Sequence, residues 1–334
     1  MKRRSIRSTF KNNKGVFSMN LFFYVIKRLA MMVPVIVGAS FVCFLLLRLS
    51  PVDPARAYLS VSNIVPTEET IAAVRAQLGL DRSFWSQYGH WLWQLCQLDF
   101  GTSFFSKLPV ARELAARLPI TATLALSSLA IAFIVSIPLG IASALRRNRL
   151  IDHMSRLLAF LGASIPQFWL AYLFLYFLSV KLDWFPLQGA DTWLHYVLPS
   201  CTLAFALIAT YSRLLRAGLI EGLQEPFVLY ARARGLGTFA VVGRHVLRHA
   251  IRPVITAAGM NLGKLFAGAV IVEQIFSMPG MGGFFLESVY HRDYPVIQSY
   301  VLIMAIAFVI GNLAADVVQA YLDPRLTQTA RKGE

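Results

Sequence analysis

The chain has 334 residues, of which 57% are hydrophobic and only 15% are charged. A water-soluble domain of this composition would have too few polar residues to cover its surface, so the composition indicates an integral membrane protein. The formal net charge of +15 comes from basic residues in short segments between apolar runs, which favours contact with anionic lipid over binding to nucleic acid. Three scattered cysteines indicate neither a disulfide framework nor a thiolate metal cluster.

Residues 1–28 form a basic tail with eight Lys or Arg and no acidic residue. We expect the part before Met19 to be disordered, and translation can start at either Met1 or Met19. The uncharged run 29–47 is long enough for a first transmembrane helix, since about 20 residues cross a bilayer. A cleaved signal peptide fits less well, because the run exceeds a typical signal core and no small-residue cleavage site follows it.

The region 48–117 is polar, with seven basic and six acidic residues, and predicts a helical insertion outside the membrane. Thr67 is a good N-cap for a helix that begins there. Glu68 and Glu69 put negative charge in its first turn, which the helix dipole favours, and Gly79 ends it. A second helix is predicted over 84–98. Its aromatic and apolar stripe favours packing on the membrane interface or a neighbouring helix over a ligand cage; its members are Trp85, Tyr88, Trp91, Leu92 and Leu95.

A five-helix core is predicted over 118–320, followed by a tail over 321–334. Its uncharged or nearly uncharged runs are 118–145, 157–180, 192–212, 253–272 and 294–315, and only Lys264 interrupts them. With the first helix they make six spans. Glycines and prolines within the runs are expected where helices pack closely, kink or line a pathway; they are Pro119, Pro138, Pro166, Pro199, Gly259, Gly263 and Gly268.

The charges of the connecting loops predict the orientation. Loop 146–156 has four basic residues and one acidic, and loop 213–252 has seven and two. Loop 181–191 has one basic residue and two acidic, and 273–293 has one and three. The positive-inside rule therefore places the first two loops and both termini in the cytoplasm, and the insertion 48–117 outside.

Loop 213–252 is too long for a simple connection and has helical patterns of its own. Pro226 suits a first helical position, and Phe227, Tyr230, Ala231 and Arg234 would share one face of a short helix that Gly235 and Gly237 stop. Thr238 can cap a second helix, whose Phe239, Val242, Val246, Leu247 and Ala250 would share a face. Such a protrusion suits either a partner's groove or an anionic lipid surface, and the pattern alone leaves both open.

The stretches YARARGL at 230–236 and RHVLRHAIRPVIT at 244–256 resemble the coupling loop of binding-protein-dependent ABC importer permeases. The likeness extends from about residue 19 to 325, and is greatest to the dipeptide, oligopeptide and nickel branch, in particular its nickel-import permeases. PTEE at 66–69, LDFGTSF at 98–104, SIPQFWLAYL at 164–173 and EQIFSMPGMGGF at 273–284 support it. The chain keeps Ala231, Gly235 and Leu247 of the family's loop motif. It departs from that motif at Leu229, Tyr230, His245 and Arg248, so the contact made by the motif's Glu is not carried over.

The resemblance implies one half of a pore. A homologous second permease, two cytoplasmic ATPases and an extracytoplasmic substrate-binding protein would complete an importer in the bacterial inner membrane. ATP and Mg²⁺ would be used by the ATPases, and this chain would be neither an enzyme nor the holder of a cofactor. ATPase coupling is assigned to Tyr230, Ala231, Arg232, Arg234, Gly235, Leu236, His245, Leu247 and Arg248.

We assign the translocation pathway to Met260, Asn261, Lys264 and Glu273. An ionisable side chain within a span is costly and usually faces a pathway or a partner. Lys264 is alternatively held by a salt bridge to Asp316 or to the second permease. Glu273 is alternatively a rim residue whose carboxylate reaches water.

The cargo is predicted to be nickel or a small metal chelate, with di- or oligopeptides as the alternative. His245 and His249 are four residues apart, which matches the spacing of a metal-binding pair, but they lie on the predicted cytoplasmic loop, so a ligand role is not favoured. An autonomous secondary transporter fits less well, because no internal repeat is visible. An intramembrane enzyme would need a catalytic pair within the spans, and no familiar pattern is present.

Overall fold

The computed structural model describes the backbone of residues 2–322 and the side chains of residues 25–320. This part of the chain is helical, and its β pairing is limited to one isolated bridge between Thr102 and Pro109. In chain order the helices are α1 (Lys2–Arg48), α2 (Pro54–Val61), α3 (Glu68–Gln77), α4 (Phe84–Cys96), α5 (Val110–Leu145), α6 (Leu150–Ser164), α7 (Gln167–Phe174), η1 (Leu175–Lys181), α8 (Trp193–Gly222), α9 (Pro226–Ala233), α10 (Thr238–Val241), η2 (Val242–Val246), α11 (Leu247–Ala250), α12 (Arg252–Ile275), α13 (Met281–His291) and α14 (Tyr294–Leu322).

Five helices are long and apolar enough to cross a membrane, namely α1 from Val25 onward, α5, α8, α12 and α14. The pair α6 and α7–η1 makes a sixth candidate span, although its halves meet at 106°. The predicted all-helical, six-span architecture is therefore confirmed. The single span expected over 157–180 is wrong in detail, because Ile165 is extended, with ψ at 122°, before Pro166. A residue before proline avoids the helical conformation, and proline cannot donate the next helical hydrogen bond.

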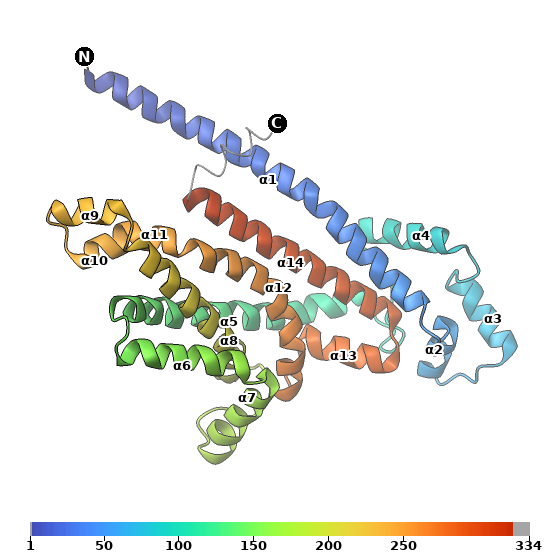
Figure 1. Cartoon of the computed structure of the whole chain (residues 1–334). Helices are drawn as coiled ribbons and strands as arrows, with labels where there is room; N and C mark the ends of the chain where they lie inside the picture. The colour runs from blue at the N-terminus through green and yellow to red at the C-terminus, as the bar shows by residue number, and fades with distance from the viewer. Residues whose placement is uncertain (1, 323–334) are drawn as a thin grey trace.

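Helix α1 runs from Lys2 to Arg48. No proline lies between residues 2 and 33, and a single Pro34 is accommodated inside the helix. The N-terminal part of α1 projects beyond the bundle, while its later part lies along α14 (Figure 1). There Arg28 forms an ion pair with Asp316 at 3.1 Å, which joins the two helices.

Helices α12 and α14 approach closely at glycines, as the sequence predicts for Gly259 and Gly263. An added Cβ on Gly259 would lie 2.9 Å from the carbonyl oxygen of Gly311. One on Gly263 would lie 2.8 Å from Cβ of Phe308. Small residues at these positions let the two backbones come together and maximise packing between the helices.

The insertion α2–α4 and the segment α9–α11 lie at opposite ends of the long helices (Figure 1). Thr67 caps α3 and accepts the N–H of Thr70, as predicted. Helix α4 begins at Phe84 as predicted, but ends at Cys96. Helix α2 was not predicted, although Asp53 caps it and Pro54 occupies its first turn, both of which are helix-start signals.

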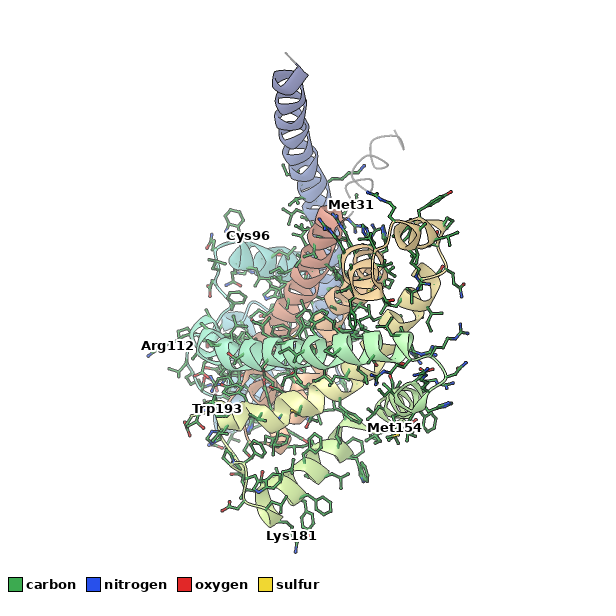
Figure 2. All side chains as sticks on the ribbon, turned by 90° about the vertical axis from the view of Figure 1, so that its left-hand side faces the viewer. Met31, Cys96, Arg112, Met154, Lys181 and Trp193 are labelled. Carbon is green, nitrogen blue, oxygen red and sulfur yellow. The ribbon has the colours of Figure 1, made fainter. Side chains whose placement is uncertain are left out.

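The aromatic stripe of α4 packs on α1. The Tyr88 hydroxyl lies 3.0 Å from Oγ of Ser40, and the rings of Trp91 and Phe44 stack with centroids 5.7 Å apart. Aromatic pairs of this kind add stability beyond the area they bury. The stripe therefore attaches the insertion to the first span, which agrees with the packing interpretation. In Figure 2, Cys96 and Arg112 lie on one side of the molecule and Met154 of α6 on the other.

Candidate functional site: a helical protrusion and an uncovered face of α12

Residues 226–250, which we call the helical protrusion, connect α8 to α12 as α9, α10, η2 and α11. Helix α9 begins with Pro226, whose missing N–H costs nothing in a first turn. It ends at Ala233, and Gly235, whose φ is +78°, follows the C-cap residue Arg234. The N–H of Gly235 donates to Arg232 O at 2.9 Å, and that of Leu236 to Ala231 O at 3.2 Å. This pair of bonds is the Schellman ending that glycine favours, so the predicted stop is confirmed.

The second part of the protrusion differs from the sequence-based prediction in two respects. Gly237, not Thr238, occupies the N-cap position of α10. The chain then makes a π-turn, η2, over Val242–Val246. A π-turn pairs residues five apart, so Val241 and Val246 are both fully buried. Phe239, which was expected on the buried face, is instead 86% exposed.

The outer surface of the protrusion carries large apolar and basic side chains. Leu229 and Tyr230 are 71% and 70% exposed, and Phe239 extends the same uncovered apolar surface. Of the predicted coupling residues, the exposed ones are Tyr230, Arg232, Arg234, Gly235, Leu236, His245 and Arg248. Ala231 and Leu247 instead pack partly against the core. Exposed aromatic groups beside arginines are the composition of protein docking surfaces.

The inner surface of the protrusion packs on α8. Val246 and Ala250 belong to the buried cluster that also holds Leu215 and Leu219 of α8. Two glycines of α8 make this approach possible. An added Cβ on Gly222 would lie 2.7 Å from Cγ1 of Val246, and one on Gly218 would lie 3.1 Å from Cα of Ala250. The protrusion is therefore held directly against a long membrane helix, so a displacement of one acts on the other.

A buried carboxylate ties three helices together near the protrusion. Asp152 of α6 is fully buried. It accepts two hydrogen bonds from Arg216 of α8, at 2.5 and 2.8 Å, one from Ser143 Oγ of α5 at 2.7 Å, and one from the N–H of Asn148 at 2.9 Å. Bidentate Arg–carboxylate pairs are strong and directional. The cluster therefore fixes the ends of α5, α6 and α8 relative to one another.

One face of α12 is uncovered along its length. Its exposed positions recur at helical spacing and are Pro253, Thr256, Met260, Lys264, Ala267, Ile271 and Gln274. The structure therefore brings Met260 and Lys264 together on one face. It places Asn261 elsewhere, since its amide donates to the Tyr211 hydroxyl at 3.2 Å. A lysine on a long apolar helix indicates that this face is not simply lipid-exposed.

The structure contradicts the proposed ion pair of Lys264 with Asp316 and the proposed rim position of Glu273, while a salt bridge from Lys264 to the second permease stays a prediction. No ion pair joins Lys264 to Asp316 among the described residues, because Asp316 pairs with Arg28 of α1. Glu273 is fully buried rather than at a rim. Its carboxylate accepts bonds from Thr121 Oγ1 at 2.5 Å and from the N–H of Gly282 at 2.7 Å. It thereby holds the start of α13 against α5 and α12.

Sequence reasoning missed three features that position these surfaces. Gly218 and Gly222 have the small-residue spacing of close helix contacts, a signal that could have been used. Asp152 stands out as the single acidic residue of a basic loop. Thr121 gave no signal, because its partners are more than 150 residues away in sequence. Within the described residues no three His, Cys, Asp or Glu come together as a possible metal site.

Six candidate spans, with a helical insertion at one end and the compact helical protrusion at the other, define a polytopic membrane protein. Residues 136–328 match the family model "Binding-protein-dependent transport system inner membrane component", and residues 21–125 match "Binding-prot-dependent transport system membrane comp, N-term". The chain belongs to this family of ABC importer permeases, which are multi-pass proteins of the inner membrane.

Individual relatives refine the comparison. The chain is 40% identical over 303 residues to the glutathione transport system permease protein GsiC of Escherichia coli (strain K12), covering 91% of this chain and 98% of that protein. It is 39% identical over the same length to GsiC of Salmonella typhimurium (strain LT2). An inward-facing structure of the MetNI methionine ABC transporter matches with a TM-score of 0.52 and 18% identity, covering 63% of this chain and 95% of that chain. The last similarity supports the fold alone.

Proposed function

We propose that this chain forms half of the translocation pore of an ATP-driven importer of short peptides such as glutathione. The observation that carries the proposal is the near full-length identity of 39–40% to permeases named for glutathione transport. These relatives favour the peptide alternative over the nickel cargo that the sequence resemblance suggested. The uncovered face of α12 also carries a lysine, which suits an anionic cargo better than a metal cation.

The helical protrusion would be the contact for a cytoplasmic ATPase. Its exposed Tyr230 and Phe239 suit insertion into an apolar groove, and its arginines suit an acidic rim. Because Val246 and Ala250 lie against α8, ATP-driven movement of the protrusion would tilt that helix and, through it, α5 and α12. ATP and Mg²⁺ would bind to the two ATPases and not to this chain.

The uncovered face of α12 would line the pore together with a homologous second permease. Met260 and Lys264 would contact the passing peptide, with the ammonium group attracting carboxylates. Asn261 and Glu273 would instead hold α12 to its neighbours. An extracytoplasmic binding protein would deliver the peptide, so the pore itself would need little selectivity.

The orientation of the chain can be tested by labelling. We propose a cytoplasmic protrusion and cytoplasmic termini, because loops 146–156 and 213–252 are strongly basic. Cys96 is exposed on the insertion, so it is first replaced by Ser. Ser62→Cys should then react with a membrane-impermeant maleimide in whole cells, and Gly237→Cys only after permeabilisation. External reaction at Gly237→Cys would contradict the orientation.

The cargo is tested by uptake into cells that lack their own peptide and nickel importers. Labelled glutathione, labelled dialanine and ⁶³Ni²⁺ are compared, with and without this chain and its partner subunits. Uptake of a peptide that needs the ATPases is the expected result. Nickel uptake without peptide uptake would restore the metal proposal, and peptide uptake that survives inactivation of the ATPases would indicate a secondary transporter.

A further inference from the structure

A cavity of about 330 Å³ lies at the end of the bundle opposite the helical protrusion. It is partly open, and it is lined by the end of α1, the junction of α3 with α4, and the start of α14. Its walls include Phe44, Trp91 and Tyr294. The volume is at the lower end of the range of small-molecule sites, which is about 300 to 1,000 Å³. The packing of α4 on α1 explains why the insertion is held over this space, but it does not explain the polar groups inside.

Two polar side-chain atoms of the cavity lining lack a hydrogen-bond partner within the described residues. Arg48 Nε and Gln87 Oε1 are buried without a hydrogen bond. Gln298 is 92% buried, from an exposed fraction of 8%, and no hydrogen bond from its side-chain amide is found. Buried polar atoms are nearly always satisfied in native proteins, so two such atoms at one cavity, beside the unbonded amide of Gln298, indicate a missing polar occupant.

The orientation of two of these groups is fixed by their surroundings. The Gln87 amide nitrogen donates to Leu80 O at 3.0 Å and to Arg82 O at 2.8 Å, so its oxygen is the atom left to accept a bond. The Arg48 guanidinium lies over the ring of Phe44, 5.1 Å from its centroid. The nearby acidic residue Asp53 is occupied by Arg75, at 2.7 Å. Arg48 therefore offers a donor that meets no carboxylate within the described residues.

The chemistry of the lining specifies the occupant. Arg48, Arg82 and His90 contribute basic groups, and no Asp or Glu lines the cavity. Glutamine amides both donate and accept, which suits a ligand that has peptide groups as well as a negative charge. We propose that this cavity binds a short peptide, with the peptide's terminal carboxylate on Arg48 and its N–H and C=O groups on Gln87 and Gln298. The choice of a peptide rests on the proposed function, while the need for an anionic, amide-bearing ligand rests on the cavity.

The test is equilibrium binding to the full chain in nanodiscs of zwitterionic lipid, without partner subunits. The probes are dialanine and dialanine amide, which differ in the carboxylate alone. Dialanine should bind, and its amide should bind at least about tenfold more weakly, because a hydrogen bond to a charged group contributes about 1.5–3 kcal/mol and tenfold corresponds to 1.4 kcal/mol. Since no ATPase is present, absence of dialanine binding would count against the cavity proposal alone, whereas absence of peptide uptake in cells would count against the proposed function.

Two variants and a matched control locate the binding. Arg48→Met keeps the length and apolar packing of the side chain and should weaken dialanine binding at least about tenfold. Gln298→Leu should also weaken it and serves if Arg48→Met does not fold. Arg56→Met changes an exposed side chain of α2 outside the cavity, and this variant should bind like the original chain. Absence of dialanine binding, equal binding of the amide, normal binding by both cavity variants, or displacement by equimolar inorganic phosphate would overturn the proposal.

Discussion

The contact of the helical protrusion with α8 gives the sharpest prediction. In an exposed helix, replacing glycine by alanine stabilises by about 1 kcal/mol. At Gly222 the added Cβ would lie 2.7 Å from Cγ1 of Val246, which is fully buried and stiff at its branched Cβ. Overpacking of this kind costs about 1–3 kcal/mol. Gly222→Ala should therefore lower the free energy of unfolding by about 1 kcal/mol, whereas helix propensity alone predicts that it would rise.

Gly89 provides the matched control. It lies inside α4, and an added Cβ there would meet nothing within 4 Å. Gly89→Ala should stabilise by about 0.5–1 kcal/mol, so the two identical substitutions should differ by about 2 kcal/mol. Unfolding in mixed micelles, followed by circular dichroism, measures both. The assembled importer should also show weaker substrate stimulation of its ATPase with Gly222→Ala only.

A second substitution identifies the clash itself. Val246→Ala removes the crowded methyl groups, so the double variant Gly222→Ala with Val246→Ala should be more stable than the sum of the two single effects, by at least about 1 kcal/mol. The claim that the protrusion is held on α8 at this point would be refuted by three results together. The effects of the two substitutions would be additive, Gly222→Ala would be as stabilising as Gly89→Ala, and substrate would stimulate the ATPase normally in the Gly222→Ala importer.

Three further predictions follow from single positions. Gly235→Val forces a branched residue to φ +78° and should abolish substrate-stimulated ATPase activity without loss of membrane insertion. Gly237→Val, at φ −67°, should leave that activity intact, and equal effects of the two substitutions would contradict the prediction. Asp152→Asn removes the charge partner of Arg216 and should lower the free energy of unfolding by about 3–5 kcal/mol, measured by denaturant titration. A loss of less than about 1 kcal/mol would mean that the cluster does not stabilise the fold. Gly259→Leu would collide with the α14 backbone and should reduce the yield of folded protein on size-exclusion chromatography, while Gly38→Leu, with nothing within 4 Å, should be tolerated.

The architecture was predictable because its determinants are local. Apolar runs of a definite length identify the spans, and Thr67 and Gly235 mark a helix start and a helix end by chemistry that acts within a few residues. The bend at Ile165 could be predicted from the sequence only in part. Pro166 signals a kink, but its angle depends on the neighbours against which the two halves pack.

The candidate sites were less predictable, because they depend on contacts between residues far apart in sequence. Glu273 has the same charge whether it faces water or the N–H groups at the start of α13, and only the fold distinguishes the two. Phe239 was misplaced because a 3.6-residue period was assumed across a π-turn. The cavity around Arg48 joins residues from positions 44 to 298, and no local pattern contains it.

The bend between α6 and α7 also bears on how the chain enters the membrane during synthesis. Helix α6 has 15 residues and is about 22 Å long at 1.5 Å per residue, which is less than the ~30 Å hydrocarbon layer. The stretch from Gln167 to Lys181 is equally short. Neither half can cross on its own, and the polar backbone groups at the break need shelter from lipid. We therefore expect the two halves to integrate together, and in the folded chain α8 packs closely against Gly162 near the break.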